Sequence, residues 1–261
     1  MDLNLTGKRA LVCGSTQGIG KAAAIELALL GADITLLARN EEKLKDTIQD
    51  LPDQGKLGHH YLVADFSNPE QLRSVIKNYL IENQIDILVN NTGGPPGGTV
   101  EDAATDEFIN AFNSHVICNQ ILVQAVSSGM KNSGFGRIIN IISTSVKTPL
   151  KGLGVSNTIR GAVASWAKTL AMELAPFGIT VNNVLPGYTM TGRLESLIGS
   201  ISAKEGKAAA DVEKDMISSI PAGRIGEAHE IAAAIAFLAS PAASYINGIN
   251  VPVDGGKTPS L

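Results

Sequence analysis

Short runs of consecutive apolar residues alternate with longer amphipathic stretches along most of the chain. The short runs are rich in Val, Ile and Leu, which is typical of strands buried on both faces, and they cover 9–13, 33–38, 61–64, 85–89, 137–142, 180–185 and 249–253. The longer stretches repeat apolar residues with helical spacing over 20–30, 41–51, 69–82, 105–130, 155–176 and 227–239. This alternation predicts an α/β fold: a doubly wound parallel sheet of about seven strands with helices on both faces.

The alternation continues without a break in composition from residue 8 to residue 254, so we expect residues 1–261 to form a single domain. One stretch departs from it. Residues 188–221 are polar and rich in Ala, Gly and Ser, and we expect a helix over 203–220 but no strand. Because long insertions after the carboxyl end of a strand more often bind ligands than decorate the surface, this stretch is predicted to be a substrate lid.

Composition and charge narrow the class of protein. The formal net charge is −4 and no run of Lys or Arg exists, which argues against nucleic acid. No apolar stretch approaches the ~18 residues of a membrane span, and the first five residues do not resemble a signal peptide. Cys13 and Cys118 are far apart and form neither a disulfide framework nor a metal site. We therefore expect a cytoplasmic protein without a metal.

A glycine-rich turn between the first strand and the first helix is the main candidate for binding chemistry. Its glycines lie at positions 14, 18 and 20, where glycine permits a tight turn and close approach of the backbone to a pyrophosphate at a helix N-terminus. A plain strand–helix turn is the alternative, but the position after the first strand favours a Rossmann-type nucleotide site. The candidate binding residues here are Gly14, Ser15, Thr16, Gly18, Ile19 and Gly20.

The end of the second strand indicates which dinucleotide is bound. A carboxylate at this position would bind the ribose 2′-hydroxyl of NAD, and none occurs at 38–40. Arg39, followed by Asn40, instead offers a planar fork for the 2′-phosphate of NADP, although a solvated Arg at a helix start is also possible. The sequence favours NADP(H), with NAD(H) as the alternative.

Several spaced motifs resemble the short-chain dehydrogenase/reductase family over essentially the whole chain. They are the glycine spacing, Asn-Asn-Thr-Gly at 90–93, Pro-Gly-Tyr-Thr-Met-Thr at 186–191 and Val-Pro-Val-Asp-Gly-Gly at 251–256. The segment 221–226 and the helix that follows look closest to the 3-oxoacyl-carrier-protein reductase branch. Cys13 departs from the family, which usually has Thr at this position; a small buried filler is the simpler interpretation.

The resemblance implies further cofactor contacts. Asp65 and Phe66 would flank the adenine, and Asn91 and Gly93 would line the ribose side. The residues that would hold the nicotinamide carboxamide and the pyrophosphate are Pro186, Gly187, Thr189 and Thr191.

The resemblance also places four catalytic positions, and two of them are atypical. Asn113 and Ser143 match the family's Asn and Ser. Thirteen residues past Ser143, where the family has Tyr, the chain has Ser156, and Arg160 stands where the family has Lys. A shift in register does not restore the motif, because the four tyrosines lie at 61, 79, 188 and 245.

This replacement changes the expected chemistry. A phenol with a pKa near 10 can be tuned to donate a proton, whereas an aliphatic hydroxyl is a poor donor and Arg cannot shuttle protons. Ser156 can still orient a carbonyl and Arg160 can stabilise an oxyanion. Tyr188 and Lys147 could each replace the missing proton donor, but we expect a packing role for Tyr188 and a solvated position for Lys147. His115 is expected at a helix–helix contact.

Two hypotheses follow. The first is an NADP(H)-dependent oxidoreductase acting on a small carbonyl or alcohol substrate, including a 3-oxoacyl thioester; the second is a cofactor-binding sensor or assembly partner without this chemistry. Small residues on the helix predicted over 155–176 permit close helix packing. With the family resemblance, they favour a homodimer or homotetramer formed through this helix and the helix predicted over 105–130.

Overall fold

The computed structural model describes residues 1–53, 55 and 58–260. Its core is one seven-stranded sheet in which every strand pairs in parallel with its neighbours, in the order β3-β2-β1-β4-β5-β6-β7. The strands are β1 (Arg9–Cys13), β2 (Asp33–Ala38), β3 (His60–Val63), β4 (Ile87–Asn90), β5 (Gly136–Ile141), β6 (Ile179–Pro186) and β7 (Asn250–Val253). The predicted α/β fold is confirmed; the predicted limits of β1 and β2 match the structure, and those of the other strands differ by one or two residues.

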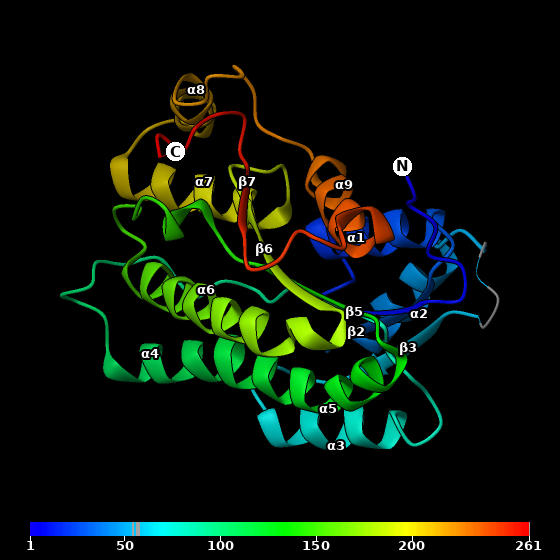
Figure 1. The fold of residues 1–261 in the computed structure, drawn as a ribbon. Coiled ribbons are helices and arrows are strands. Elements are labelled where there is room, and N and C mark those ends of the chain that lie inside the picture. Colours follow the sequence, from blue (N-terminus) through cyan, green and yellow to red (C-terminus); the bar gives the residue numbers. More distant parts are fainter. Residues whose placement is uncertain (54, 56–57, 261) are drawn as a thin grey trace.

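Helices cover both faces of the sheet (Figure 1). On one face, α1 (Gly18–Leu29), α2 (Glu41–Gln49) and α9 (Ala228–Ala239) pack on a cluster that includes Leu27, Leu44 and Ile235. On the other face, α3 (Pro69–Tyr79), α5 (Cys118–Ser133) and α6 (Gly154–Leu174) pack on a second cluster that includes Leu72 and Leu122. Within the described residues, no helix is long and apolar enough to cross a membrane.

The strand order reverses between β1 and β4, which are neighbours in the sheet although β2 and β3 separate them in sequence. In open α/β sheets, ligands bind at such a point, outside the carboxyl ends of the strands. The carboxyl ends of β1, β4, β5 and β6 therefore mark the edge where the candidate site is expected.

Two predicted helices are wrong in detail. The helix expected over 105–130 is divided into α4 (Thr105–Phe112), a π-helical turn (Asn113–Ile117) and α5. The helix expected over 203–220 is replaced by α7 (Gly192–Glu205) and α8 (Ala209–Ser218). Gly206 separates these two helices with φ +67°, a left-handed conformation that ends a helix. The two helices pack together through a small apolar cluster that includes Leu194 and Met216.

Four asparagine side chains form a continuous ladder across the second half of the sheet. Asn90, Asn140, Asn183 and Asn250 are register partners on β4, β5, β6 and β7. The Nδ2 of each donates to the Oδ1 of the next, at 2.8, 2.9 and 2.8 Å. Buried amides are costly unless they are paired, so the ladder favours this one register of the four strands.

We predict that Asn140→Leu destabilises the protein by about 2–5 kcal/mol, because it removes the partners of two amides, those of Asn90 and Asn183, that are themselves buried. Urea unfolding monitored by circular dichroism measures this free energy. The matched control is Asn250→Leu at the partly exposed end of the ladder, which removes one partner and should cost about 1 kcal/mol. Equal losses in both variants would contradict a cooperative role for the ladder.

Candidate functional site

The turn after β1 is built so that two segments of backbone can approach closely. Gly14 and Gly18 have left-handed φ angles of +58° and +55°. A side chain at Gly14 would lie 2.6 Å from the Asn91 carbonyl oxygen, and one at Gly20 would collide with the Gly14 carbonyl. The glycines are therefore required by the fold of this turn, and they leave its outer surface free of side chains.

The N-terminus of α1 follows this turn directly, and no acidic side chain occupies its first amides. Gln17, the N-cap residue, makes no side-chain hydrogen bond, and the first turn contains no acidic residue. Ser15 points inward, where its hydroxyl accepts from the Leu37 amide at 3.1 Å, and Thr16 and Ile19 are partly buried. The first amides of a helix are unpaired donors that attract anions. This combination of bare backbone and free amides fits a pyrophosphate.

Two later segments close on the same turn. Asn91, just after β4, donates from Nδ2 to the carbonyl oxygens of Cys13 and Gly14, at 3.2 and 3.3 Å. The Cγ2 of Thr191 would lie 3.2 Å from a side-chain carbon at Gly18. The structure thus brings together the residues that the sequence places at the glycine turn, after β4 and after β6.

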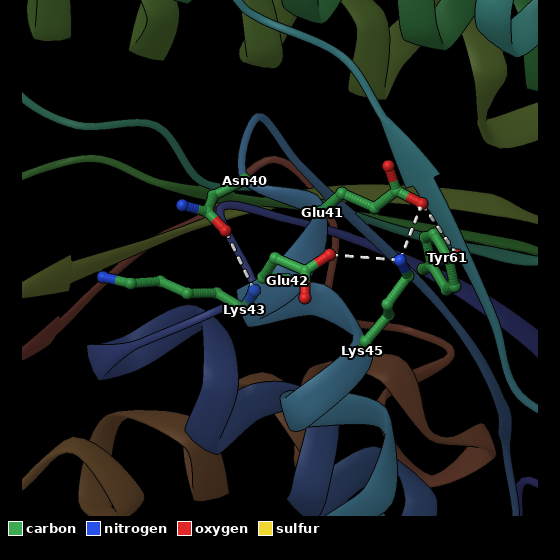
Figure 2. A network of polar contacts seen from close by, with 6 residues as sticks. All are labelled: Asn40, Glu41, Glu42, Lys43, Lys45 and Tyr61. Atoms are coloured by element: carbon green, nitrogen blue, oxygen red, sulfur yellow. Dashed lines mark hydrogen bonds and ion pairs between the residues drawn. The ribbon is translucent and has the colours of Figure 1, made fainter.

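The end of β2 presents one exposed cation. Arg39 is exposed, and it forms no ion pair within the described part of the chain. Asn40 caps α2, its Oδ1 accepting from the Lys43 amide at 2.9 Å. Beyond the cap, Glu41 contacts Lys45 and Tyr61 (Figure 2).

The two acidic side chains that follow in the chain, Glu41 and Glu42, are already engaged. Glu41 lies 3.3 Å and Glu42 3.1 Å from the Lys45 ammonium, and the Tyr61 hydroxyl donates to Glu41 at 3.2 Å. Neither carboxylate takes the place of the carboxylate that binds the ribose 2′-hydroxyl in NAD-binding sites.

Asp65 and Phe66 follow β3 on the same edge of the sheet. The Asp65 carboxylate accepts from the Ser67 amide at 2.8 Å, and this hydrogen bond is the main reason why its pKa is lowered; the charge of Arg39 acts in the same direction. Phe66 is partly buried, and its carbonyl accepts from the Cys118 thiol. Burial raises the pKa of Cys118 to about 12, and that of the fully buried Cys13 also rises, so both thiols are packing groups.

The chain after β6 makes a tight turn. The Gly187 amide donates to the Val253 carbonyl at 3.0 Å, and a side chain at Gly187 would collide with Asp254 at 2.7 Å, so Pro186 and Gly187 lie directly against the end of β7. Thr189 is buried and its hydroxyl donates to the Gly187 carbonyl, while Thr191 caps α7. These contacts hold the first residues of the 188–221 segment next to the glycine turn.

Tyr188 packs away from the predicted catalytic residues. Its ring lies 4.9 Å from the Lys257 ammonium and packs on the α7–α8 cluster, and burial raises the pKa of its hydroxyl. Lys147 is exposed. The packing role expected for Tyr188 and the solvated position expected for Lys147 agree with these surroundings.

Ser143 and Ser156 lie at the carboxyl end of β5 and in the first turn of α6. The Ser143 oxygen accepts from the Ser145 amide at 3.1 Å, which leaves its hydroxyl proton free to donate. Ser156 is partly buried, and its hydroxyl has no hydrogen-bond partner among the described residues. Both hydroxyls are therefore available to a ligand.

Arg160 is 8% exposed and lies one turn further along α6. Its Nη1 donates to the Ile141 carbonyl at 2.8 Å, whereas its Nε is buried without a partner in the described structure. Burial and the charge of Arg193 lower the pKa of Arg160 to about 10. A buried guanidinium with spare donors, beside a second cation, is suited to bind an anionic or oxyanionic group.

The structure places His115 beside Arg160. The π-helical turn directs His115 into the interior, where Nδ1 lies 2.5 Å from the Thr92 hydroxyl and the ring also bonds the Gly93 backbone. Asn113 is partly buried and makes no hydrogen bond through its side chain within the described residues. The π-helical turn that carries His115 packs against α6, as expected for a helix–helix contact, and the hydrogen-bond partners of the ring lie in the loop after β4.

Burial, reinforced by the positive charge of Arg160, lowers the pKa of His115 to about 3. The imidazole is therefore neutral, and it holds the loop at Thr92 and Gly93. Gly93 itself is exposed, with open space where a side chain would lie.

A parallel doubly wound sheet with a bare glycine turn at its switch point defines the Rossmann-like class of nucleotide-binding proteins. Within this class, the chain belongs to the short-chain dehydrogenase/reductase family of oxidoreductases. A family profile described as "Enoyl-(Acyl carrier protein) reductase" matches residues 14–258.

Individual relatives cover nearly the whole chain. The 3-oxoacyl-[acyl-carrier-protein] reductase FabG of Haemophilus influenzae is 38% identical over 97% of this chain and 98% of its own length. The NADPH-dependent reductase BacG of Bacillus subtilis is 31% identical over 98% of this chain and all of its own. The L-sorbose reductase of Gluconobacter frateurii, solved with NADPH and L-sorbose, superposes with a TM-score of 0.92 at 28% identity, over the full length of both chains.

We predict that His115 makes stability fall below neutral pH. The unfolded imidazole has a pKa of 6.5 and the folded one of about 3, so the unfolded chain binds a proton that the folded chain excludes between these values. The stability that His115 contributes is present above pH 6.5 and is lost as the pH falls toward 3. When the pH falls from 7.5 to 5, the free energy of unfolding measured in urea should drop by roughly 2 kcal/mol more in the wild type than in His115→Gln.

The control is His229→Gln, at an exposed position of α9. It retains His115 and should retain the wild-type dependence on pH. If His115→Gln keeps that dependence too, the neutral buried imidazole is ruled out.

Proposed function

We propose that this protein is an NADP(H)-dependent oxidoreductase that moves a hydride between the nicotinamide and a carbonyl or alcohol substrate. The observation that carries the proposal is the turn after β1, where Gly14 and Gly20 are packed too closely for side chains and the α1 amides are free. NADPH supplies the hydride when bound. Relatives described as an NADPH-dependent reductase and as a complex with NADPH support this class of cofactor.

The preference for NADP(H) rests on Arg39. It is exposed at the end of β2 without an ion pair among the described residues, and Glu41 and Glu42, the next acidic residues in the chain, are held by Lys45 (Figure 2), so Arg39 is available to a ribose phosphate. On the same assignment, Gly14, Gly18, Gly20 and the backbone at Ser15, Thr16 and Ile19 hold the pyrophosphate.

The remaining assignments follow the positions of the strand ends. Asp65 and Phe66 flank the adenine after β3, and Asn91 and Gly93 line the ribose after β4. Asn40 supports the 2′-phosphate as the cap of α2. The nicotinamide end is held by Pro186, Gly187, Thr189 and Thr191.

Catalysis on this assignment depends on hydroxyl donors and a fixed cation. Ser143 and Ser156 donate to the carbonyl oxygen, and Arg160 stabilises the negative charge that develops on it during hydride addition. Because Arg160 keeps its proton, water supplies the proton that completes the alcohol. Asn113 lies on the helix behind this group, and His115 acts by holding the Gly93 loop.

We extend the proposal to the organisation of the protein. Residues 1–261 form one domain, and 188–221 closes over the substrate, since Thr189 and Thr191 attach its first residues to the sheet edge. Homodimers or homotetramers form through α4, α5 and α6, where Ile109, Phe112 and Met172 are exposed apolar side chains. The free, buried cysteines suit the cytoplasm.

A cofactor-binding sensor is the second candidate. The observation in its favour is that none of the four tyrosines contacts Ser143, Ser156 or Arg160 in the described structure, so a phenolic proton donor is missing. Tight binding of NADPH without turnover of any carbonyl would support this candidate.

We predict that Arg39→Ala weakens binding of NADPH by about 10–100-fold, the value of a charge-assisted hydrogen bond to a phosphate, and changes binding of NADH by less than about threefold. Titration calorimetry with both nucleotides measures this difference. Arg73→Ala on the exposed side of α3 removes an equal charge and should change neither the affinity for NADPH nor that for NADH. Equal affinity of the wild type for NADPH and NADH would refute the preference.

We further predict that Ser143→Ala lowers kcat by about 10²–10³-fold, because one donor to the developing oxyanion is lost, and leaves the affinity for NADPH unchanged. Absorbance of the nicotinamide during reduction of ketones and 3-oxoacyl thioesters measures the rate. Thr148→Val, at an exposed position of the same loop, is the matched control and should retain the wild-type rate. An unchanged rate in Ser143→Ala would remove this serine from the mechanism.

A further inference from the structure

Two arginines from distant parts of the chain converge on one backbone position. A side-chain carbon at Gly94 would lie 3.7 Å from Arg160 Nη2 and 3.6 Å from Arg193 Nη2. Arg160 comes from α6, and Arg193 is the second residue of α7 in the 188–221 segment. The two guanidinium groups therefore lie on the same side of the loop after β4, with no side chain of residue 94 between them.

Neither arginine has an acidic partner among the described residues. Arg160 has a single hydrogen bond, to the Ile141 carbonyl, and its buried Nε has none. Arg193 donates from Nη2 to the Pro95 carbonyl at 2.8 Å, and its other nitrogens have no described partner. Most of the donors of both groups are thus free.

This pairing is unfavourable without an anion. Like charges repel, and Arg193 contributes to the lowered pKa of Arg160. Burial of a charged group is costly unless it is paired and hydrogen-bonded. His115, the other titratable group beside Arg160, is neutral and offers no compensating negative charge.

Arg160 connects the pair of arginines to the elements that carry the two proposed catalytic serines. Arg160 shares α6 with Ser156, and its acceptor Ile141 lies two residues before Ser143. An anion bound by both arginines would lie on the side of the Gly94–Pro95 loop, one helical turn along α6 from Ser156.

We infer that Arg160 and Arg193 together bind a carboxylate group of the substrate, so that the protein acts on oxo acids or hydroxy acids rather than on neutral ketones or sugars. A planar guanidinium matches a carboxylate with two parallel hydrogen bonds, and two guanidiniums match both of its oxygens. The inference rests on the proposed function in one respect: the carboxylate belongs to the molecule whose carbonyl meets Ser143 and Ser156.

The kinetic test compares 3-oxobutanoate with its methyl ester, which differ in the negative charge. The wild type with NADPH should prefer the acid by 10–100-fold in kcat/KM. Arg193→Gln should lower kcat/KM for the acid by 10–100-fold, mainly through KM, and change it for the ester by less than about threefold. Lys204→Gln removes a charge from the exposed side of the same helix and should leave the preference intact.

A binding test without turnover separates the two ideas. Calorimetry should show that succinate binds the complex of the wild type with NADP⁺, that succinamide does not, and that Arg193→Gln abolishes the binding of succinate. If succinate binds in this way but no carbonyl is reduced, the carboxylate site stands and the proposed enzyme function fails.

Two results would overturn the inference. Equal reduction of acid and ester would exclude a carboxylate site while leaving the oxidoreductase function in place. A tenfold or greater loss of affinity for NADPH itself in Arg193→Gln would assign this arginine to a phosphate of the cofactor instead. Absence of both succinate binding and turnover in the wild type would overturn both proposals.

Discussion

The ladder of asparagine amides across β4, β5, β6 and β7 is the constraint on which the candidate site depends. Each amide donates to the next within 2.9 Å, at positions that are already register partners, so a shift of one strand would unpair two buried amides. The ladder begins at the last residue of β4, crosses β5 one residue before its end and β6 in its middle, and ends at the first residue of β7. It therefore fixes the starting points of Asn91 after β4 and Ser143 after β5, and of the turn after β6.

The polar side chains grouped around Arg160 are of two kinds: neutral groups and cations. Ser143 and Ser156 are hydroxyls, His115 is neutral, and Arg160 and Arg193 are charged without acidic partners in the described structure. Such a site stabilises negative charge well but transfers protons poorly, because neither serine nor arginine changes its protonation near neutral pH. The arrangement favours chemistry in which electrostatic stabilisation of an oxyanion carries most of the rate enhancement.

The fold and the glycine turn could be predicted because they depend on local sequence signals. Buried parallel strands form continuous apolar runs, and Gly14 and Gly18 occupy left-handed positions that only glycine adopts easily. The hydrogen bonds of His115 to Thr92 and Gly93 could not be predicted, because helical spacing assumes 3.6 residues per turn and the π-helical turn at Asn113–Ile117 departs from that spacing. The pairing of Arg193 with Arg160 could not be predicted, because these residues are far apart in sequence and meet only where α7 packs over the edge of the sheet.

These residues are physically consistent with one another. A phenol needs a neighbouring group that adjusts its pKa, and a permanently charged, buried Arg160 suits a hydroxyl that orients the substrate better than one that ionises. Burial, together with this charge, keeps His115 neutral, and the neutral ring can then bond both Thr92 and the Gly93 backbone. Arg193 donates to the carbonyl of Pro95, three residues after Thr92 in the same loop. The first residues of the loop between β4 and α4 are thus held both by His115 and by Arg193 of the 188–221 segment, so a ligand that recruits Arg193 acts on the same loop that lines the site.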